Sequence, residues 1–186
     1  MFKFIFFLLF SVVLTSSAYA QSSFKIYMER CQNLRPQIES ILVEEGLPTY
    51  FFYLALAESG CKVDNESKYH AKGLYQLLPR TFIAYSKGVC FTDKPCPLEK
   101  INDPLVSTRV AARYLKSLYD RYDKNLDWVV AAYNAGGTNL KRKTSYVKGK
   151  DFAIVRKYYP QAYNLSMKVR SFSQMDGYQE EKPSKS

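Results

Sequence analysis

Residues 50–60 read YFFYLALAESG and decide the fold, because eight apolar or aromatic side chains in a row lead directly into Glu58 and Ser59. A helix with this sequence has no polar face, so we expect protein to surround it on all sides. A carboxyl group at the end of such a helix is partly desolvated, which raises its pKa. A carboxylic acid that stays protonated near neutral pH can donate a proton to the oxygen leaving a glycosidic bond. Taken alone, the same pattern also describes a surface carboxylate at a helix end.

The C-terminal half of the chain contains a second segment of this kind. Residues 126–133 are apolar apart from Asp127, and they end in the polar cluster Asn134-Ala135-Gly136-Gly137. Before them, Asn102-Asp103-Pro104 has the pattern of a helix cap followed by proline at the first helical position. The long amphipathic helix that we expect after this cap presents one stripe, formed by Leu105, Thr108, Ala112, Leu115, Tyr119 and Tyr122.

The rest of the chain is also helical in its periodicity, and no long alternating strand pattern or internal repeat is present. We therefore expect a mainly α, single, compact domain. The other segments that we expect are a helix around Ile38, Ile41 and Leu42, a polar loop at 64–72, a short helical turn at 73–78 stopped before Pro79, a basic loop at 141–150, and two short helices in 151–172 divided at Pro160.

Composition limits the classes of protein. The chain has 186 residues, a formal net charge of +10, four Cys and one His. These values are typical of a globular domain, and they exclude a disordered chain, a collagen, a multi-span membrane protein and a His-rich metal site. The positive charge favours a polyanionic partner. The sequence contains no nucleic-acid-binding motif, so we expect no nucleic-acid partner.

The N-terminus has the pattern of a targeting segment. A positive start, an apolar run at 4–14 and Ala18-Tyr19-Ala20 before Gln21 predict a secretory signal peptide at residues 1–20. We then expect one domain at 21–172 and a polar, disordered tail at 173–186. The apolar run is too short for a permanent membrane span, although an uncleaved anchor remains the alternative.

Export changes the interpretation of the cysteines, since disulfides form in oxidising compartments. Cys90 and Cys96 flank a short irregular segment, which favours a disulfide between them and leaves Cys31 to pair with Cys61. Four cysteines allow three pairings, so this pairing is a hypothesis. The alternative is a thiolate nucleophile with His70 as its base.

Three motifs occur in order, Glu58-Ser59-Gly60, Gly73-Leu74-Tyr75-Gln76 and Ala132-Tyr133-Asn134-Ala135-Gly136. Together they resemble the Slt-type soluble lytic transglycosylases of bacterial peptidoglycan metabolism, whose catalytic domain has a goose-lysozyme-like fold. The resemblance covers roughly residues 38–141. It implies that Glu58 is the sole catalytic acid and base, that peptidoglycan glycan strands are the substrate, and that neither a metal nor an organic cofactor is required.

The same resemblance suggests the residues that contact the substrate. Gln76 would do so from the cleft wall, after a close turn that Gly73 permits, and Tyr75 would make the cleft more aromatic. Tyr133 would orient Glu58 through its hydroxyl, and Asn134 would contact the sugar. Ser59 would bind near the carboxyl or simply satisfy the helix end.

The reaction that the resemblance implies is non-hydrolytic cleavage of the MurNAc-GlcNAc β-1,4 bond, which gives 1,6-anhydromuramic acid. Two alternatives stay open, a goose-lysozyme-like hydrolase and a catalytically silent peptidoglycan-binding assembly factor. A hydrolase of the usual design needs a second carboxylate. Asp103 is better explained as a helix cap, and Asp64, Glu66 and Asp93 have no apolar surroundings like those of Glu58.

Two further expectations concern the cellular location of the protein and a departure of its last helix from the family pattern. We expect a periplasmic, cell-wall-associated or secreted protein, recruited by a wall-spanning secretion or conjugation apparatus. Many relatives carry Glu-Thr and then Tyr-Val in the last helix, where this chain has Ala162-Tyr163 and Ser166-Met167. That departure predicts a changed distal wall of the cleft.

Overall fold

Two helices without a polar face form the centre of the fold in the computed structural model, which describes residues 21–180. Helix α3 (Phe52–Ser59) is buried along its whole length apart from Glu58, which is partly buried, and α6 (Leu126–Ala135) is buried from Asp127 to Tyr133. Both were predicted from their continuous apolar sequences, and both predictions are confirmed. The signal peptide predicted at 1–20 lies outside the described residues.

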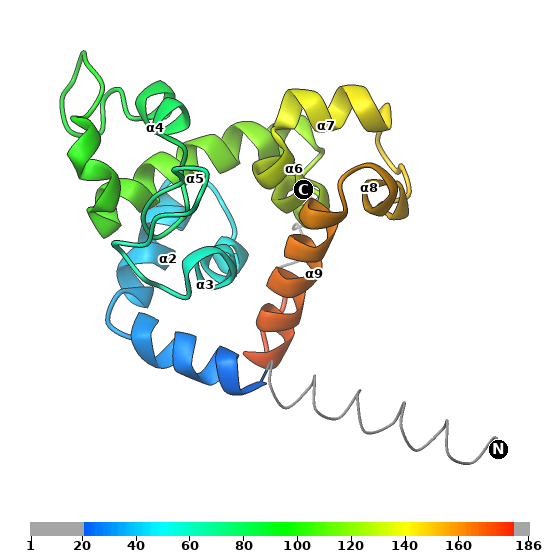
Figure 1. Cartoon of the computed structure of the whole chain (residues 1–186), viewed down its shortest axis with the longest axis horizontal. Coiled ribbons are helices and arrows are strands. Elements are labelled where there is room, and N and C mark those ends of the chain that lie inside the picture. The colour runs from blue at the N-terminus through cyan, green and yellow to red at the C-terminus, as the bar shows by residue number, and fades with distance from the viewer. Residues whose placement is uncertain (1–20, 181–186) are drawn as a thin grey trace, which may run out of the picture.

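The other helices pack against this pair or against one another (Figure 1). They are α2 (Arg35–Glu44), α4 (Pro79–Tyr85), α5 (Pro104–Arg121), α7 (Gly137–Thr144), α8 (Ala153–Tyr158) and α9 (Pro160–Met175), with short 3-10 helices η1 (Thr49–Phe51) and η2 (Leu98–Asn102). Residues 21–31 are helical as well. Within residues 21–180 there is no strand, only isolated bridges, so the prediction of a mainly α domain is confirmed.

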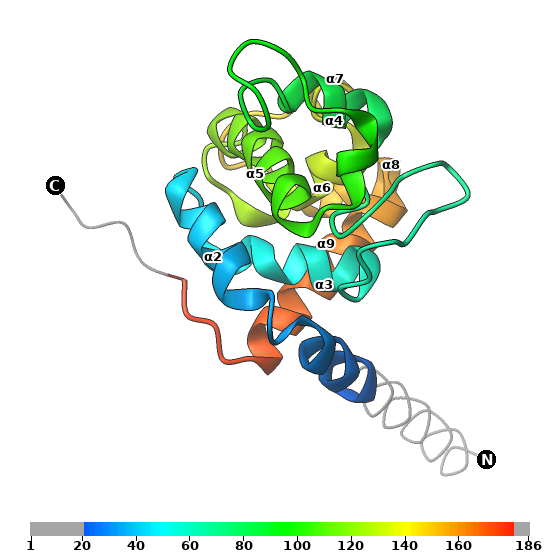
Figure 2. The same ribbon diagram turned by 90° about the vertical axis from the view of Figure 1, so that its left-hand side faces the viewer.

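The long helix α5 begins where the cap motif predicts. The Asp103 carboxylate accepts hydrogen bonds from the backbone N–H groups of Leu105 and Val106, both at 3.1 Å, which satisfies two free donors of the first turn. From there α5 packs against α2, α4 and α6 (Figure 2). Leu105 lies at the exposed start of the predicted stripe, whereas the stripe is buried at Thr108, Ala112, Leu115 and Tyr122.

Helix α9 crosses both central helices, and its last turns pack against the N-terminal helix at 21–31. It packs against α6 and α3 (Figure 1), and near its end Phe172 contacts the rings of Phe24 and Tyr27, with centroids 5.5 Å and 6.1 Å away. It runs to Met175, so the boundary expected at 172 falls inside a helix. No helix in the described part of the chain combines the length and apolar character that crossing a membrane requires.

Two assignments of secondary structure are wrong. Residues 73–76 form a turn between two bridges, and Pro79 begins α4 rather than stopping a helix. Residues 141–143 belong to α7 rather than to a loop, because Leu140 and Thr144 anchor one face of that helix in the core.

Both predicted disulfides are present, Cys31 with Cys61 and Cys90 with Cys96. All four cysteines are therefore in disulfides, and His70 is hydrogen-bonded to Glu66 on an exposed loop. This arrangement overturns the alternative of a thiolate nucleophile with a histidine base.

Candidate active site

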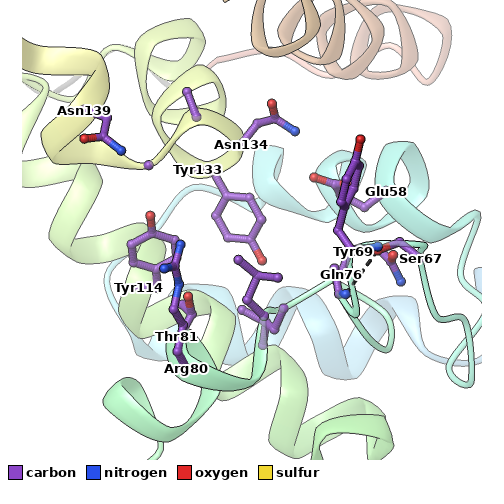
Figure 3. A pocket seen from close by; sticks show the side chains of 15 residues that line it. Glu58, Ser67, Tyr69, Gln76, Arg80, Thr81, Tyr114, Tyr133, Asn134 and Asn139 are labelled. Atoms are coloured by element: carbon purple, nitrogen blue, oxygen red, sulfur yellow. Dashed lines mark hydrogen bonds between the residues drawn. The ribbon is translucent and has the colours of Figure 1, made fainter. Parts of the chain in front are cut away.

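A cavity of about 350 Å³ opens beside the end of α3 (Figure 3). Glu58 from α3, Gln76 from the turn before α4, and Tyr133 and Asn134 from α6 all line it. The three sequence motifs, which are far apart in the chain, therefore meet at one cavity. Glu58 is the only carboxyl group among the described residues that line its wall.

The Glu58 carboxyl has an unusual acidity. Burial raises its pKa from 4.5 to about 7, because desolvation penalises the charged form, and the Lys168 cation partly opposes that rise. At neutral pH a carboxyl with the ordinary value would be only about 0.3% protonated, whereas Glu58 is about half protonated. It can therefore act both as a proton donor and, once ionised, as a proton acceptor.

Contacts from distant parts of the chain fix the end of α3. The Lys168 amine of α9 donates a hydrogen bond of 2.6 Å to the Ala57 carbonyl. Arg30 donates another, also of 2.6 Å, to the carbonyl of Gly60, which ends the helix in a left-handed conformation. The disulfide at Cys61 follows directly. Glu58 is thus held on a rigid support, as an acid catalyst requires.

Ser59 connects α3 to the second motif. Its hydroxyl donates to the Leu74 carbonyl at 2.7 Å and lies 3.2 Å from the Ala55 carbonyl. The side chain is buried and does not line the cavity. Of the two roles considered for Ser59, the structure supports fixing the helix end against the neighbouring turn.

The turn at 73–76 needs a glycine for two reasons. Gly73 has φ +72°, and a Cβ added there would lie 2.5 Å from the Ile101 carbonyl oxygen. At the other end of the turn, the Gln76 amide nitrogen donates to the carbonyls of Asn65 and Gly73, each at 3.0 Å. This leaves the side-chain oxygen of Gln76 as an acceptor on the cavity wall.

Tyr75 does not make the cavity aromatic, so that prediction is wrong. Its ring is fully buried, and its hydroxyl donates to the Phe51 carbonyl at 3.3 Å. The backbone of Tyr75 matters instead, because its carbonyl accepts the hydroxyl proton of Tyr133 at 2.8 Å. That bond joins the second motif to the third.

Tyr133 lies close to Glu58, but its hydroxyl does not donate a hydrogen bond to the Glu58 carboxyl. Its single hydroxyl hydrogen goes to the Tyr75 carbonyl, whereas its oxygen can still accept. Burial raises the pKa of Tyr133 well above the ordinary value, and the nearby Glu58 charge adds to the effect. Tyr133 is thus a neutral hydrogen-bonding group that faces a neutral or ionised Glu58.

Several residues of the cavity wall were not predicted from the sequence. They are Ser67, Tyr69, Arg80, Thr81, Tyr114 and Asn139. Arg80 and Thr81 were missed because Pro79 was interpreted as the end of a helix rather than its first residue. Proline suits either position, and only the packing of Phe82 in the core distinguishes them.

The residues of the last-helix departure lie away from this cavity. Ser166 of α9 is buried and donates to the Asp127 carboxylate of α6 at 3.0 Å, and Arg170 forms an ion pair with the same carboxylate. Neither Ser166 nor Met167 lines the cavity wall. The departure therefore does not alter the wall of this cavity, and Ser166 contributes to the contact between α6 and α9.

The acids considered for a second catalytic role have structural explanations. Asp103 caps α5, as predicted. Glu66 is hydrogen-bonded to His70 and forms an ion pair with Lys72 on the exposed loop. Asp64 and Asp93 are exposed and do not line the cavity.

Known proteins share this fold. The lytic transglycosylase Slt of Pseudomonas aeruginosa, solved as an inactive mutant with a glutamate replaced by glutamine, superposes with a TM-score of 0.66 over 77% of this chain at 23% identity. The 70 kDa soluble lytic transglycosylase of Escherichia coli gives a TM-score of 0.60 over 75% of the chain at 20% identity. The matched region is 24% and 23% of those two chains.

Sequence comparison gives a further relative and the family. A protein of Alteromonas sp. (strain M-1) named for tributyltin chloride resistance is 27% identical over 130 residues, which cover 70% of this chain and 60% of that protein. The model of the transglycosylase SLT domain matches residues 37–155, from α2 into α8. Because this match includes more than half of the chain and all three motifs at the cavity, the protein belongs to the transglycosylase SLT domain family.

Proposed function

We propose that the protein is a peptidoglycan lytic transglycosylase that cleaves the β-1,4 bond between N-acetylmuramic acid and N-acetylglucosamine without using water. The observation that carries this proposal is the position of Glu58, a carboxyl with a pKa of about 7 on the wall of a 350 Å³ cavity. Membership of the family supports the substrate class. The relative from P. aeruginosa, described as inactive after a glutamate-to-glutamine replacement, supports a glutamate as the catalytic group.

In the proposed reaction one carboxyl group serves twice. Protonated Glu58 gives its proton to the bridging oxygen as the bond from that oxygen to C1 of the muramic ring breaks. The resulting carboxylate then takes the proton from the C6 hydroxyl of the same ring while the oxygen of that hydroxyl bonds to C1. The product is 1,6-anhydromuramic acid, and Glu58 ends the cycle protonated. A pKa near the working pH suits both steps.

The surroundings of Glu58 favour this scheme over hydrolysis by two carboxylates. A hydrolase of the usual design places a second carboxyl about 5 to 9 Å from the first. Glu58 is the only acid among the described residues of the cavity wall, and the wall offers neutral partners in Gln76, Tyr133 and Asn134. One carboxyl is sufficient when the substrate provides its own nucleophile.

The test is mass spectrometry of the products released from purified sacculi. The wild type is expected to release anhydro-muropeptides, and Glu58→Gln is expected to release none while still binding sacculi. Glu99→Gln, at an exposed glutamate outside the cavity, provides the matched control and should keep full activity. Products heavier by the mass of one water, about 18 Da, would identify a hydrolase instead. Equal release by the wild type and Glu58→Gln would reject Glu58 as the catalytic acid and base.

We also propose that the protein acts outside the cytoplasm, in the periplasm or cell wall, where its substrate lies. A wall-spanning secretion or conjugation apparatus is the partner that we propose. Co-purification of the protein with such an apparatus from cross-linked cells is the expected result. Activity spread uniformly over the wall, with no cross-linked partner, would argue against recruitment.

A further inference from the structure

Arg80 gives the cavity its one permanent charge. Among the described residues of the wall, only Glu58 and Arg80 carry acidic or basic side chains. Glu58 is about half protonated at neutral pH because burial raises its pKa to about 7, whereas a guanidinium stays charged throughout the accessible pH range. An anionic group entering the cavity is therefore attracted by a single fixed cation.

The guanidinium of Arg80 also has no hydrogen-bond or ion-pair partner in the described part of the chain, unlike the guanidinium groups of the arginines that join helices. Arg35 pairs with Glu39 and Asp176, and Arg109 pairs with Glu44 and Glu45. Within residues 21–180 no hydrogen bond, ion pair or ring contact occupies the exposed Arg80 side chain.

The position of Arg80 relative to Glu58 is informative. In Figure 3, Arg80 lies with Thr81 and Tyr114 on one side of the Tyr133 ring, and Glu58 lies on the other. The Arg80 charge is close enough to Tyr114 to lower the pKa of that hydroxyl, against the larger effect of burial. The rings of Tyr114 and Tyr133 have centroids 5.3 Å apart, so the wall between the acid and the cation is aromatic.

We propose that Arg80 binds a carboxylate of the substrate strand while Glu58 acts on the glycosidic bond. This inference rests on the proposed function. A guanidinium presents a planar fork of N–H donors that matches the two oxygens of a carboxylate. Aromatic rings beside it can pack against the C–H face of a sugar. Arg80 is therefore a specificity-determining residue, which selects strands by a charge that lies away from the bond being cleaved.

Two groups of a glycan strand could supply this carboxylate. One is a carboxylate of the stem peptide, and the other is the lactyl carboxylate of a muramic acid whose peptide has been removed. An oligomer of N-acetylglucosamine carries neither. Comparing these three ligands therefore tests the inference and distinguishes its two sources.

The experiment measures binding in the Glu58→Gln background, so that no ligand is consumed. Fluorescently labelled strands with stem peptides, strands freed of their peptides, and N-acetylglucosamine oligomers of the same length are titrated in turn. Arg80→Ala is expected to weaken binding of the strand with the recognised carboxylate about tenfold, the effect of losing one charge-assisted hydrogen bond, and to leave the oligomer unchanged. The affinity of Arg80→Lys for that strand should lie between those of Arg80→Ala and of the protein that keeps Arg80, because lysine retains the charge but not the planar fork of donors.

Arg142→Ala is the matched control. Arg142 is an exposed arginine of α7 that lies outside the cavity, and its removal changes the net charge by the same amount. It should leave the binding of all three ligands unchanged. A circular dichroism spectrum and an unfolding curve for Arg80→Ala and Arg80→Lys check that both variants fold.

Every outcome of this comparison is decisive. Weakening confined to peptide-bearing strands assigns the stem carboxylate, and weakening confined to peptide-free strands assigns the lactyl carboxylate; weakening of both shows that either group is accepted. Equal weakening of all three ligands, or no weakening of any, would overturn the inference. The proposed reaction is judged separately, since Arg80-dependent binding together with a wild type that releases no anhydro products would reject the reaction and keep the binding site.

Discussion

The amine of Lys168 donates a hydrogen bond of 2.6 Å to the carbonyl of Ala57, the residue before Glu58. This contact joins α9 to the end of α3 across 111 positions of sequence. It also places a cation near the proposed acid, where the cation lowers the pKa that burial raises. The proton affinity of Glu58 is thus set by two opposing effects, and the larger one is desolvation.

The first prediction concerns pH. If Glu58 must be protonated at the start of the reaction, activity is high below its pKa and falls as the pH rises through about 7. Lys168→Met removes the cation that lowers this pKa, so the alkaline limb of the pH–rate profile should move to higher pH. Lys168→Arg keeps the charge and should leave the limb near its original position. An unmoved limb in Lys168→Met would show that the profile reports a different group.

The second prediction concerns stability. The Glu58 pKa is about 7 in the folded protein and near 4.5 in the unfolded chain, so both states hold the proton below pH 4.5. Between pH 4.5 and pH 7 the unfolded chain releases this proton whereas the folded protein keeps it. The free energy of unfolding therefore falls as the pH rises, and the loss levels off above pH 7. The shift corresponds to about 3 kcal/mol.

Glu58→Gln has no such penalty, so its free energy of unfolding should exceed that of the wild type by a margin that grows from pH 4.5 to 7. Urea unfolding between pH 4 and pH 8 measures this margin. A margin that stays constant with pH would contradict the assigned pKa. The Glu99→Gln variant controls for the loss of a surface charge.

The third prediction compares the two disulfides. The Cys31–Cys61 bridge spans 30 positions and the Cys90–Cys96 bridge spans 6, so the chain-entropy model predicts losses of about 4 and about 2 kcal/mol on their removal. Paired Cys→Ser variants and denaturant unfolding measure both losses. Only the first bridge adjoins the helix end that carries Glu58, so activity should fall more in that variant than in the other at equal fractions folded.

The fourth prediction tests the close turn at Gly73. Gly73→Ala forces a left-handed backbone on alanine and brings its Cβ within 2.5 Å of the Ile101 carbonyl, so we expect a loss of about 3 kcal/mol and of activity, since Gln76 must move. Gly149→Ala is the matched control, because Gly149 has φ +78° with open space around it and should cost about 1 kcal/mol. Similar losses in the two variants would show that the backbone conformation, rather than the contact with Ile101, controls the effect.

Sequence patterns predict the parts of this fold that depend on local physics. Residues 50–57 are apolar, as are 126–133 apart from Asp127, and both segments therefore become central helices. Asp103 caps α5 because a short carboxylate before proline reaches the first free N–H groups. Local patterns did not place Gln76, Tyr133 and Asn134 beside Glu58; the resemblance to the Slt family implied that they share a cleft, and in the structure all four line one cavity.

Other features depend on contacts between distant segments. The direction of the Tyr75 ring follows from the core around Phe51, and the Lys168 contact depends on how α9 crosses α3. Helix α7 did carry a local signal, since Leu140 and Thr144 are four residues apart and both are buried. The run of Lys141, Arg142 and Lys143 obscured it, because charge alone does not distinguish a solvated helix face from a loop.

The contacts of Phe172 with Phe24 and Tyr27 have a consequence for how this domain combines with others. They bring the first helix of the described chain, at 21–31, next to the last turns of α9, its final helix. A unit with neighbouring entry and exit can be inserted into a longer polypeptide without pulling its catalytic helices apart. In the two solved relatives the matched region is about a quarter of the chain, so in both a unit of this size is part of a much longer polypeptide.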